Sequence, residues 1–260
     1  MKKLIALLLA LTMLVAFAGC NPQKPQETNA PETTAPKQTE NSDSNAMSHE
    51  EFAAAAMDTE VVVETYVQAI ESWWDGKIQV YAMSDDGGYY IYNLACSEEE
   101  AAKFVPGTKI RVTGFKAEWS GEVEIIDAKY EILEGEPKIF EANDVTALMG
   151  TDELAAHMNE LVAVKGLTVA ASKDANGNDV PYLYKWDGSG SQGDDLYFNV
   201  TLGDQTYTFT VNAYMLGTGA DSDVYKAIEG LKIGDTIDIE GFLYWYNAPQ
   251  PHVTSVTPAA

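Results

Sequence analysis

Aromatic residues gather in segments that the sequence predicts to be loops or strand ends. Their flat faces, with Asp, Asn and Gln nearby, suit sugar rings, which present apolar C–H faces and hydroxyl edges. The alternative is that these rings close the ends of folded domains or join two of them. Seven aromatic residues are the candidate ligand-binding residues: Trp73, Trp74, Trp119, Tyr182, Trp186, Trp245 and Tyr246.

A candidate metal site lies in the stretch Asp-Ala-Asn-Gly-Asn-Asp that begins at residue 174. Asp174, Asn176 and Asn178 place oxygen ligands at alternate positions, as a calcium-binding loop does. The glycine is fourth rather than sixth, and Lys185 is twelfth, where an EF-hand has a bidentate Glu. The stretch therefore predicts either a Ca²⁺ site or a plain Asn-Gly turn.

Motifs of the common enzyme classes are absent from the sequence. The chain has no Gly-rich phosphate loop, Gly-x-Ser-x-Gly, His-Glu-x-x-His or Cys-x-x-Cys. With 40 Asp and Glu residues, some carboxylates will lie at a glycosidase-like separation by chance, so such pairs carry no information. We expect a protein that is not an enzyme and that has no cofactor beyond the Ca²⁺ considered above. A metal-dependent hydrolase, using the 174 loop with a histidine, is the less favoured alternative.

The charge balance is strongly acidic. The sequence has 16 Lys and Arg residues against 40 Asp and Glu, a formal charge of −24. Arg111 is its only arginine, so bidentate contacts to phosphate or guanine are scarce, and we expect no nucleic acid partner. Such a charge could attract cationic peptides, basic proteins or divalent cations, or it could serve solubility alone.

The first twenty residues read as an export signal. Two lysines precede an apolar run over 4–18, which ends in Phe-Ala-Gly-Cys with the cysteine at Cys20. These last four residues resemble the lipobox of bacterial lipoproteins, although Phe17 stands where Leu is usual. The resemblance implies that residues 1–19 are removed, that Cys20 is lipidated, and that the protein is anchored extracytoplasmically to the bacterial cell membrane.

Residues 20–46 combine the lipidated cysteine with a predicted disordered linker. The segment from 21 to 46 consists largely of Pro, Thr, Asn, Gln, Glu and Ser and contains no aromatic residue. Such a composition buries too little apolar surface to offset the entropy lost on ordering. We expect it to tether the folded part to the membrane.

The rest of the chain contains a near-repeat. Residues 106–115 match residues 233–242 around a shared Gly-x-x-Ile-x-Val/Ile-x-Gly-Phe pattern, and the segments upstream match as well. The second copy is longer by roughly 25 residues, which fall in the Gly-, Asp-, Asn- and Ser-rich stretch 172–195. The sequence thus predicts two domains, 47–137 and 138–260, with a loop insertion at 172–195 in the second.

Alternating apolar residues predict five strands in each copy, with a short helix between the third and fourth. Capping boxes at Ser48 and Ser97, each with Glu three residues later, mark a short leader helix and the internal helix of the first copy. The predicted strands cover 60–69, 77–83, 88–94, 109–118 and 122–132, then 161–170, 196–202, 206–212, 236–246 and 252–257.

This element order resembles the OB-fold, a five-stranded Greek-key barrel. The resemblance implies a mainly β protein of two tandem barrels, each with a helix between strands 3 and 4 and a leader helix. It also implies a ligand site on strands 2 and 3, flanked by the loops that join strands 1 to 2 and 4 to 5. The candidate aromatic residues fall in those loops, so we expect a non-catalytic binding module for polysaccharide or cell-wall glycan. A scaffold for extracellular proteins, or an accessory subunit of a surface complex, is the alternative.

Overall fold

The computed structural model describes residues 45–259, which belong to one compact unit, Ser44–Ala260. The predicted signal segment 1–19, Cys20 and the linker up to residue 44 lie outside the described residues. None of the helices in the described part is long and apolar enough to cross a membrane.

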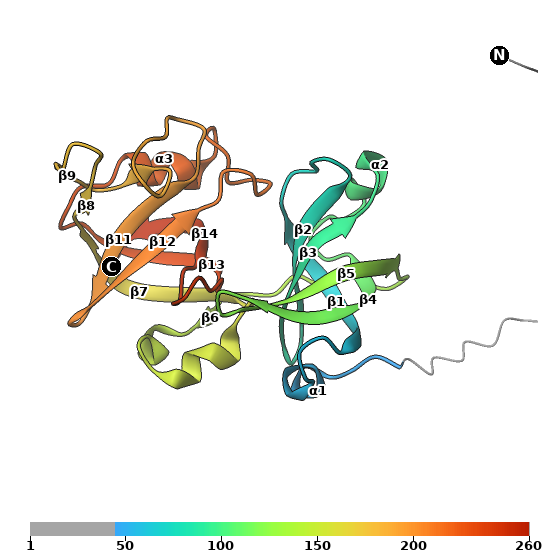
Figure 1. The fold of residues 1–260 in the computed structure, drawn as a ribbon. Coiled ribbons are helices and arrows are strands. Elements are labelled where there is room, and N and C mark those ends of the chain that lie inside the picture. Colours follow the sequence, from blue (N-terminus) through green and yellow to red (C-terminus); the bar gives the residue numbers. More distant parts are fainter. Residues whose placement is uncertain (1–44, 260) are drawn as a thin grey trace, which may run out of the picture. The chain divides into compact units, whose positions relative to one another are not determined.

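The first half is a closed barrel of five strands in the order β1-β2-β3-β5-β4 (Figure 1). Neighbouring strands are antiparallel except β3 and β5, which pair in parallel through Tyr90 and Ile91. The pairing of β1 with β4 closes the cylinder. Its strands are β1 (Glu60–Ile70), β2 (Lys77–Ser84), β3 (Gly87–Ala95), β4 (Lys109–Trp119) and β5 (Glu122–Ile132).

Two short helices flank this barrel, and both begin at the predicted capping boxes. Ser48 caps α1 (His49–Ala54) and Ser97 caps α2 (Glu98–Ala101), each in exchange with the Glu three residues on. Phe52 of α1 packs into the barrel core. The buried Lys116 ammonium donates to three carbonyl oxygens at the end of α1, at 2.7 to 3.0 Å, where the helix has unpaired acceptors.

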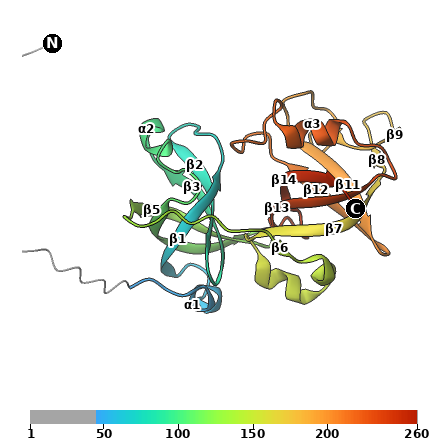
Figure 2. The same cartoon turned by 180° about the vertical axis from the view of Figure 1, so that it is seen from behind.

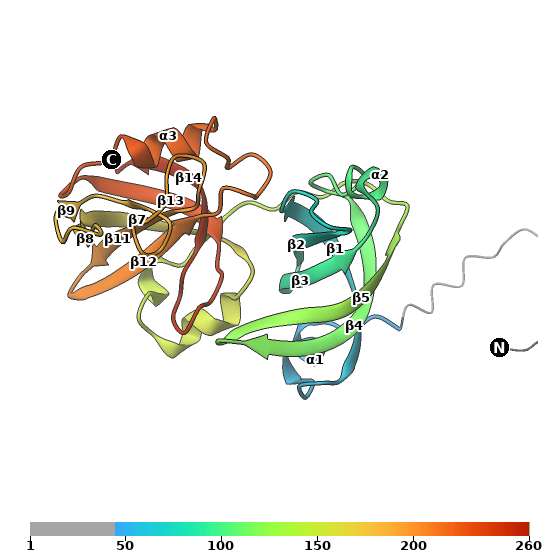
Figure 3. The same cartoon turned by 45° about the horizontal axis from the view of Figure 1, so that its top comes forward.

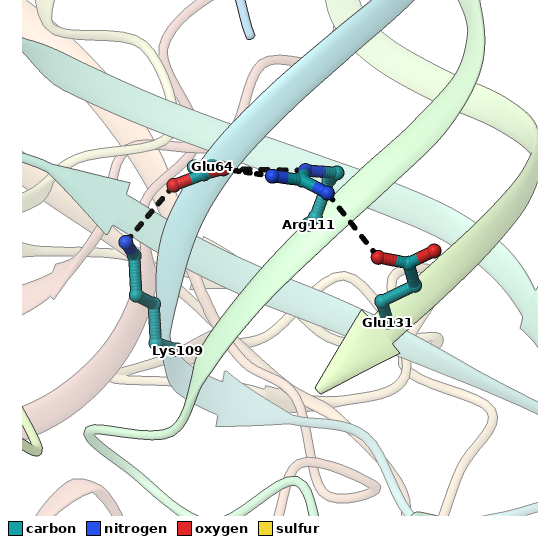
Figure 4. A network of polar contacts seen from close by, with 4 residues as sticks. All are labelled: Glu64, Lys109, Arg111 and Glu131. Carbon is teal, nitrogen blue, oxygen red and sulfur yellow. Dashed lines mark hydrogen bonds and ion pairs between the residues drawn. The ribbon is translucent and has the colours of Figure 1, made fainter. Parts of the chain in front are cut away.

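The sole arginine of the chain is held on the outer surface of the first barrel (Figure 4). Arg111 lies directly across from Glu64 on β1 and from Glu131 on β5. Its guanidinium contacts Glu64 at 2.6 Å and Glu131 at 3.3 Å, while Lys109 contacts the other oxygen of Glu64 at 2.9 Å. The ion pairs therefore link three neighbouring strands across one face of the barrel.

The second half repeats the architecture. Five strands close into a barrel because β11 pairs with β7 as well as with β12, and β12 pairs in parallel with β14. The internal helix α3 (Asp223–Glu229) packs against β14 (Figure 2). The barrel strands are β7 (Leu161–Ala170), β11 (Leu196–Leu202), β12 (Gln205–Val211), β13 (Thr236–Phe242) and β14 (His252–Pro258).

Short strands and 3₁₀ helices are added to the second barrel. The strand β6 (Asn143–Asp144) adds to β7, and β10 (Leu183–Tyr184) adds to β11. Within the insertion, β8 (Ser172–Lys173) pairs with β9 (Asp179–Val180). The 3₁₀ helices η1 (Thr146–Leu148) and η2 (Asp152–His157) precede the barrel.

Equivalent glycines show why the repeated motif is needed. Gly114 and Gly241 each lie at a register shift in the fourth strand of their barrel. A Cβ at Gly114 would lie 2.7 Å from the Ile125 side chain, and one at Gly241 would lie 2.5 Å from the His252 carbonyl oxygen. A long strand can therefore coil around the barrel only if these positions lack a side chain. The predicted fold class, two tandem five-stranded OB-fold-like barrels, is confirmed.

The predicted leader helix of the second barrel is present as η2, a 3₁₀ helix. One local prediction was wrong. The strand predicted over 236–246 ends at Phe242, since the chain turns where Asn247 has a φ of 58° and Trp245 pairs with Pro249.

Buried contacts join the two barrels. Tyr81, Tyr90, Met215 and Phe242 form one cluster, in which the Tyr81 ring stacks on Phe242 at 4.5 Å between centroids. The Tyr81 hydroxyl lies 2.9 Å from Nδ1 of His252, and burial lowers the pKa of this histidine to about 4. The turn between β4 and β5 reaches the β13–β14 loop, where the Asn247 N–H donates to the Ser120 carbonyl at 2.6 Å (Figure 3).

Candidate ligand-binding cleft

A cleft of about 720 Å³ opens on the outer face of β11 and β12. Along β11, buried Leu196, Phe198 and Val200 alternate with Tyr197 and Asn199, which therefore point away from the barrel core. Thr208 and Thr210 of β12, and Asn212 just after it, also line the cleft. This is the face of strands 2 and 3 on which OB-folds bind ligands. We call it the aromatic cleft.

Three of the predicted aromatic residues line this cleft together. Trp119 comes from the end of β4, Trp186 from the insertion, and Tyr246 from the β13–β14 loop. Their exposed fractions are 53%, 69% and 46%, so their faces are open to a ligand. The Trp119 and Tyr246 rings lie 5.3 Å apart at 37°. Tyr90, Tyr197 and Tyr244 also line the cleft.

Two carboxylates line the same cleft. Glu71 follows β1, and one of its oxygens accepts a hydrogen bond from the Asn212 amide at 2.7 Å. Asp195 precedes β11 and accepts from the Ala213 N–H at 2.8 Å. Burial raises the pKa of Glu71 to about 7, and the nearby Asp195 charge contributes in the same direction. Burial likewise raises the pKa of Asp195.

Neither carboxylate has a cationic partner among residues 45–259. Lys173 also lines the cleft, but its ammonium pairs with Asp179 at 2.7 Å. His252 stays neutral at physiological pH because burial lowers its pKa to about 4. The aromatic cleft therefore holds two acids without a cationic partner among the described residues, between aromatic walls.

Two other predicted aromatics lie in a second cleft of about 600 Å³, which shares Glu71 with the aromatic cleft and is also lined by Asp75 and Tyr214. Trp74 is 82% exposed there. Trp73 is only partly exposed, packs against the first core, and donates from its ring N–H to the Cys96 carbonyl at 3.0 Å. The pair thus divides between a structural and an exposed position, as alternation along an extended segment requires.

The last two predicted aromatics serve packing. Tyr182 packs against the second core and meets Tyr184 edge-on, with centroids 5.4 Å apart. Trp245 packs against the same core, and its backbone N–H donates to the buried Glu122 carboxyl at 2.7 Å. Neither Tyr182 nor Trp245 lines the aromatic cleft.

The 174 loop is organised by its own hydrogen bonds. The Asp174 carboxylate accepts from the backbone N–H groups of Asn176 and Asn178, at 2.9 and 2.8 Å, and from the Asn178 side-chain amide at 3.0 Å. Among the described residues, no group of three or more His, Cys, Asp and Glu side chains is arranged to hold a metal. None of the three candidate ligands lines the aromatic cleft.

Sequence reasoning missed several residues that line the cleft. Tyr197, Asn199 and Thr208 could have been found, because they occupy the outward positions of the two strands on which OB-folds bind ligands. Glu71 and Asp195 gave no signal, since each is one acid among 40 and the contacts that bury them come from distant segments.

No protein-family model matches the chain, and no curated protein matches its sequence. Solved structures with a similar fold include "Structure of murine DNA binding protein bound with ds DNA", at 12% identity and a TM-score of 0.33, covering 76% of this chain and 96% of that one. Another is "Crystal structure of Ifi202 HINa domain in complex with 20bp dsDNA", at 10% identity and TM-score 0.32, covering 79% and 99%. A third is "Crystal structure of the tetrameric p202 HIN2", at 13% identity and TM-score 0.32, covering 79% and 96%.

These neighbours contradict two predictions made from the sequence. The first two are described as bound to double-stranded DNA, whereas the sequence predicted a glycan-binding or protein-scaffolding module and no nucleic acid partner. Both predictions are withdrawn. At 10 to 13% identity and TM-scores of 0.32 to 0.33, these likenesses do not assign a ligand to this chain, which has to be inferred from the cleft itself.

Proposed function

We propose that the protein is a binding protein whose aromatic cleft holds an organic cation. The observation that carries this proposal is the placing of Glu71 and Asp195 in one aromatic-walled cleft, with no cationic partner among the described residues. Ionised carboxylates taken out of water are stable only when a counter-charge or hydrogen bonds compensate them. A bound cation supplies that counter-charge.

The aromatic walls favour the same ligand class. A cation over the face of Trp or Tyr is attracted by the ring quadrupole, worth on the order of 0.5 to 2 kcal/mol. Trp119, Trp186 and Tyr246 offer such faces in the same cleft as the carboxylates. The cleft volume of about 720 Å³ is within the range of small-molecule sites, about 300 to 1,000 Å³. The chain's formal charge of −24 would speed the approach of a cation.

Binding without chemistry fits the arrangement of the polar groups in the cleft. His252, the only histidine in its lining, is neutral and its Nδ1 is engaged by the Tyr81 hydroxyl. Tyr90 and Tyr244 have pKa values raised above the normal value by burial, so they hold their protons at neutral pH. We therefore propose a carrier or sensor rather than an enzyme.

We further propose that the protein works outside the cytoplasm, anchored through lipid on Cys20. The support is the sequence pattern alone: an apolar run over 4–18 followed by Ala-Gly-Cys. Expression in a bacterium fed radiolabelled palmitate tests this. If Cys20→Ser loses both the radiolabel and its place in the membrane fraction, the lipid anchor is supported. A wild-type chain that takes up no label would refute it.

Isothermal titration calorimetry with matched ligands tests the cleft. The purified protein is titrated with 2-phenylethylammonium and with 2-phenylethanol, which has the same ring and no charge. We expect saturable binding of the ammonium alone, weakened in Asp195→Asn and retained in Asp204→Asn, an exposed acid outside the cleft. Equal binding of both compounds, or of neither, would refute the proposal. A DNA duplex in the same assay checks whether nucleic acid is the ligand instead.

A further inference from the structure

One hydroxyl that lines the aromatic cleft has no partner. Thr210 on β12 is 2% exposed, and its Oγ1 makes no hydrogen bond to any described residue. Its backbone N–H is already used by the Pro251 carbonyl at 3.1 Å. Buried polar side chains are almost always satisfied, and an unmade hydrogen bond is unfavourable, so this hydroxyl calls for a partner from outside the chain.

Thr210 lines the same cleft as the two carboxylates. Thr210 lies directly across from Tyr197 of β11, two residues beyond Asp195. Asn212 is two residues beyond Thr210 and contacts Glu71. Thr210 and Asn212 both line the cleft.

The unused atoms at this place are hydrogen-bond acceptors. Asn212 occupies Oε1 of Glu71 and the Ala213 N–H occupies Oδ1 of Asp195, which leaves the second oxygen of each carboxylate without a protein donor within residues 45–259. An ionised carboxylate only accepts, whereas a hydroxyl can accept through its lone pairs while its own O–H donates elsewhere. A ligand with several N–H donors can therefore satisfy the two carboxylates and the hydroxyl at once.

We propose that the bound cation is a primary or secondary ammonium whose N–H groups donate to Glu71, Asp195 and the Thr210 hydroxyl. A quaternary ammonium carries the same charge and makes the same cation–π contacts, but it has no N–H to donate. Thr210 thus sets the selectivity between the two kinds of cation. This inference rests on the proposed function, since it specifies the ligand of the same cleft.

Two ligands that differ only at nitrogen test it: 2-phenylethylammonium and its N,N,N-trimethyl derivative. For the wild-type protein we expect the primary ammonium to bind about tenfold more tightly, as one charge-assisted hydrogen bond implies. Thr210→Val keeps the shape and removes the hydroxyl. It should weaken binding of the primary ammonium about five- to tenfold and leave the trimethyl compound unchanged, and Thr210→Ser should restore the preference.

The outcomes separate the two proposals. If neither cation binds, the proposed function fails and this inference with it. If both bind with equal affinity and Thr210→Val weakens neither, the function stands and the N–H selectivity is wrong. If Thr210→Val only lowers the unfolding temperature while the preference for the primary ammonium persists, the hydroxyl has a structural partner such as water, and the assignment to Thr210 is overturned.

Discussion

The Asn212 side-chain amide donates to the Glu71 carboxylate at 2.7 Å, although the two residues lie 141 positions apart in the chain. Glu71 follows the first strand of the first barrel, and Asn212 follows the third strand of the second. Their bond places an acid from one repeat beside the ligand face of the other. The aromatic cleft is therefore a product of the duplication, because a single barrel would lack Glu71 and Trp119.

Replacing that acid should impair binding without unfolding the protein. Glu71→Gln keeps an oxygen that can accept from Asn212 but removes the charge. We expect the affinity for 2-phenylethylammonium to fall about tenfold or more, because a hydrogen bond to a charged group is worth about 1.5 to 3 kcal/mol. Calorimetry measures the loss. Retained affinity in Glu71→Gln would show that this carboxylate does not meet the cation.

The exposed tryptophans of the cleft should contribute through their ring faces. Trp119→Ala and Trp186→Ala should each lower the affinity by about three- to thirtyfold, which corresponds to the usual range of a cation–π contact. Trp74→Ala is the control, since Trp74 is 82% exposed and lines the second cleft, which shares only Glu71 with the aromatic cleft. Quenching of tryptophan fluorescence follows the titration. An effect of Trp74→Ala as large as that of Trp186→Ala would contradict the location of the site.

The affinity for an ammonium should rise with pH around neutrality. The pKa of Glu71 is raised to about 7, so protons compete with the cation for its carboxylate below that pH. Asp195, the other acid of the cleft, also has a raised pKa, whereas Tyr90, Tyr244 and His252 keep neutral side chains between pH 6 and 8. If one carboxylate must ionise, the affinity should be about tenfold higher at pH 8 than at pH 6. A flat profile in the wild-type protein would contradict the account, and Glu71→Gln should flatten it.

The Tyr81 hydroxyl, which contacts His252 across the two barrels, should contribute to the stability of the protein. Tyr81→Phe leaves the buried Nδ1 of His252 without its partner at 2.9 Å. We expect the free energy of unfolding to fall by about 1 to 3 kcal/mol. Urea denaturation compares this variant with Tyr92→Phe, which alters a 39% exposed ring. Similar midpoints for the two variants would show that the hydroxyl contact adds nothing.

Gly241, the counterpart of Gly114 in the second barrel, should not tolerate a side chain. In Gly241→Ala the new Cβ would lie 2.5 Å from a backbone oxygen of His252, so the bulge in β13 would have to open. We expect a loss of about 1 to 3 kcal/mol, as overpacked sites show. Gly135→Ala is the control, because a Cβ there would meet only the Lys109 side chain, at 3.7 Å. Equal unfolding midpoints would contradict the steric argument.

The sequence predicted most of the fold, because the signals that specify it are local. The strands 122–132, 161–170 and 196–202 have the predicted bounds, since alternating apolar residues end at Gly- or Asp-containing turns. The two capping boxes gave the starts of α1 and α2. An error arose where the local signal was misleading: the residues after Phe242 continue an aromatic pattern although the chain turns.

The site was less accessible to sequence reasoning. Large aromatic rings in loops drew attention to Trp119, Trp186 and Tyr246, but the same criterion selected Tyr182 and Trp245, which pack against the core. The acids that give the cleft its charge could not be chosen, because nothing local separates Glu71 from the exposed acids. Glu71 meets Asn212 of the other barrel and Asp195 meets Ala213 of its own barrel, and these contacts appear only in three dimensions.

The most direct test of the central claim is a pH titration of the Glu71 carboxyl, measured by ¹³C NMR with and without 2-phenylethylammonium. Without ligand, the signal that disappears in Glu71→Gln should titrate with a pKa of about 7. A bound cation favours the ionised form, so saturating ligand should move this pKa down by at least about one unit, equivalent to about 1.4 kcal/mol. A pKa that stays unchanged at saturation would mean that no cation lies beside Glu71, and the proposed function would be wrong.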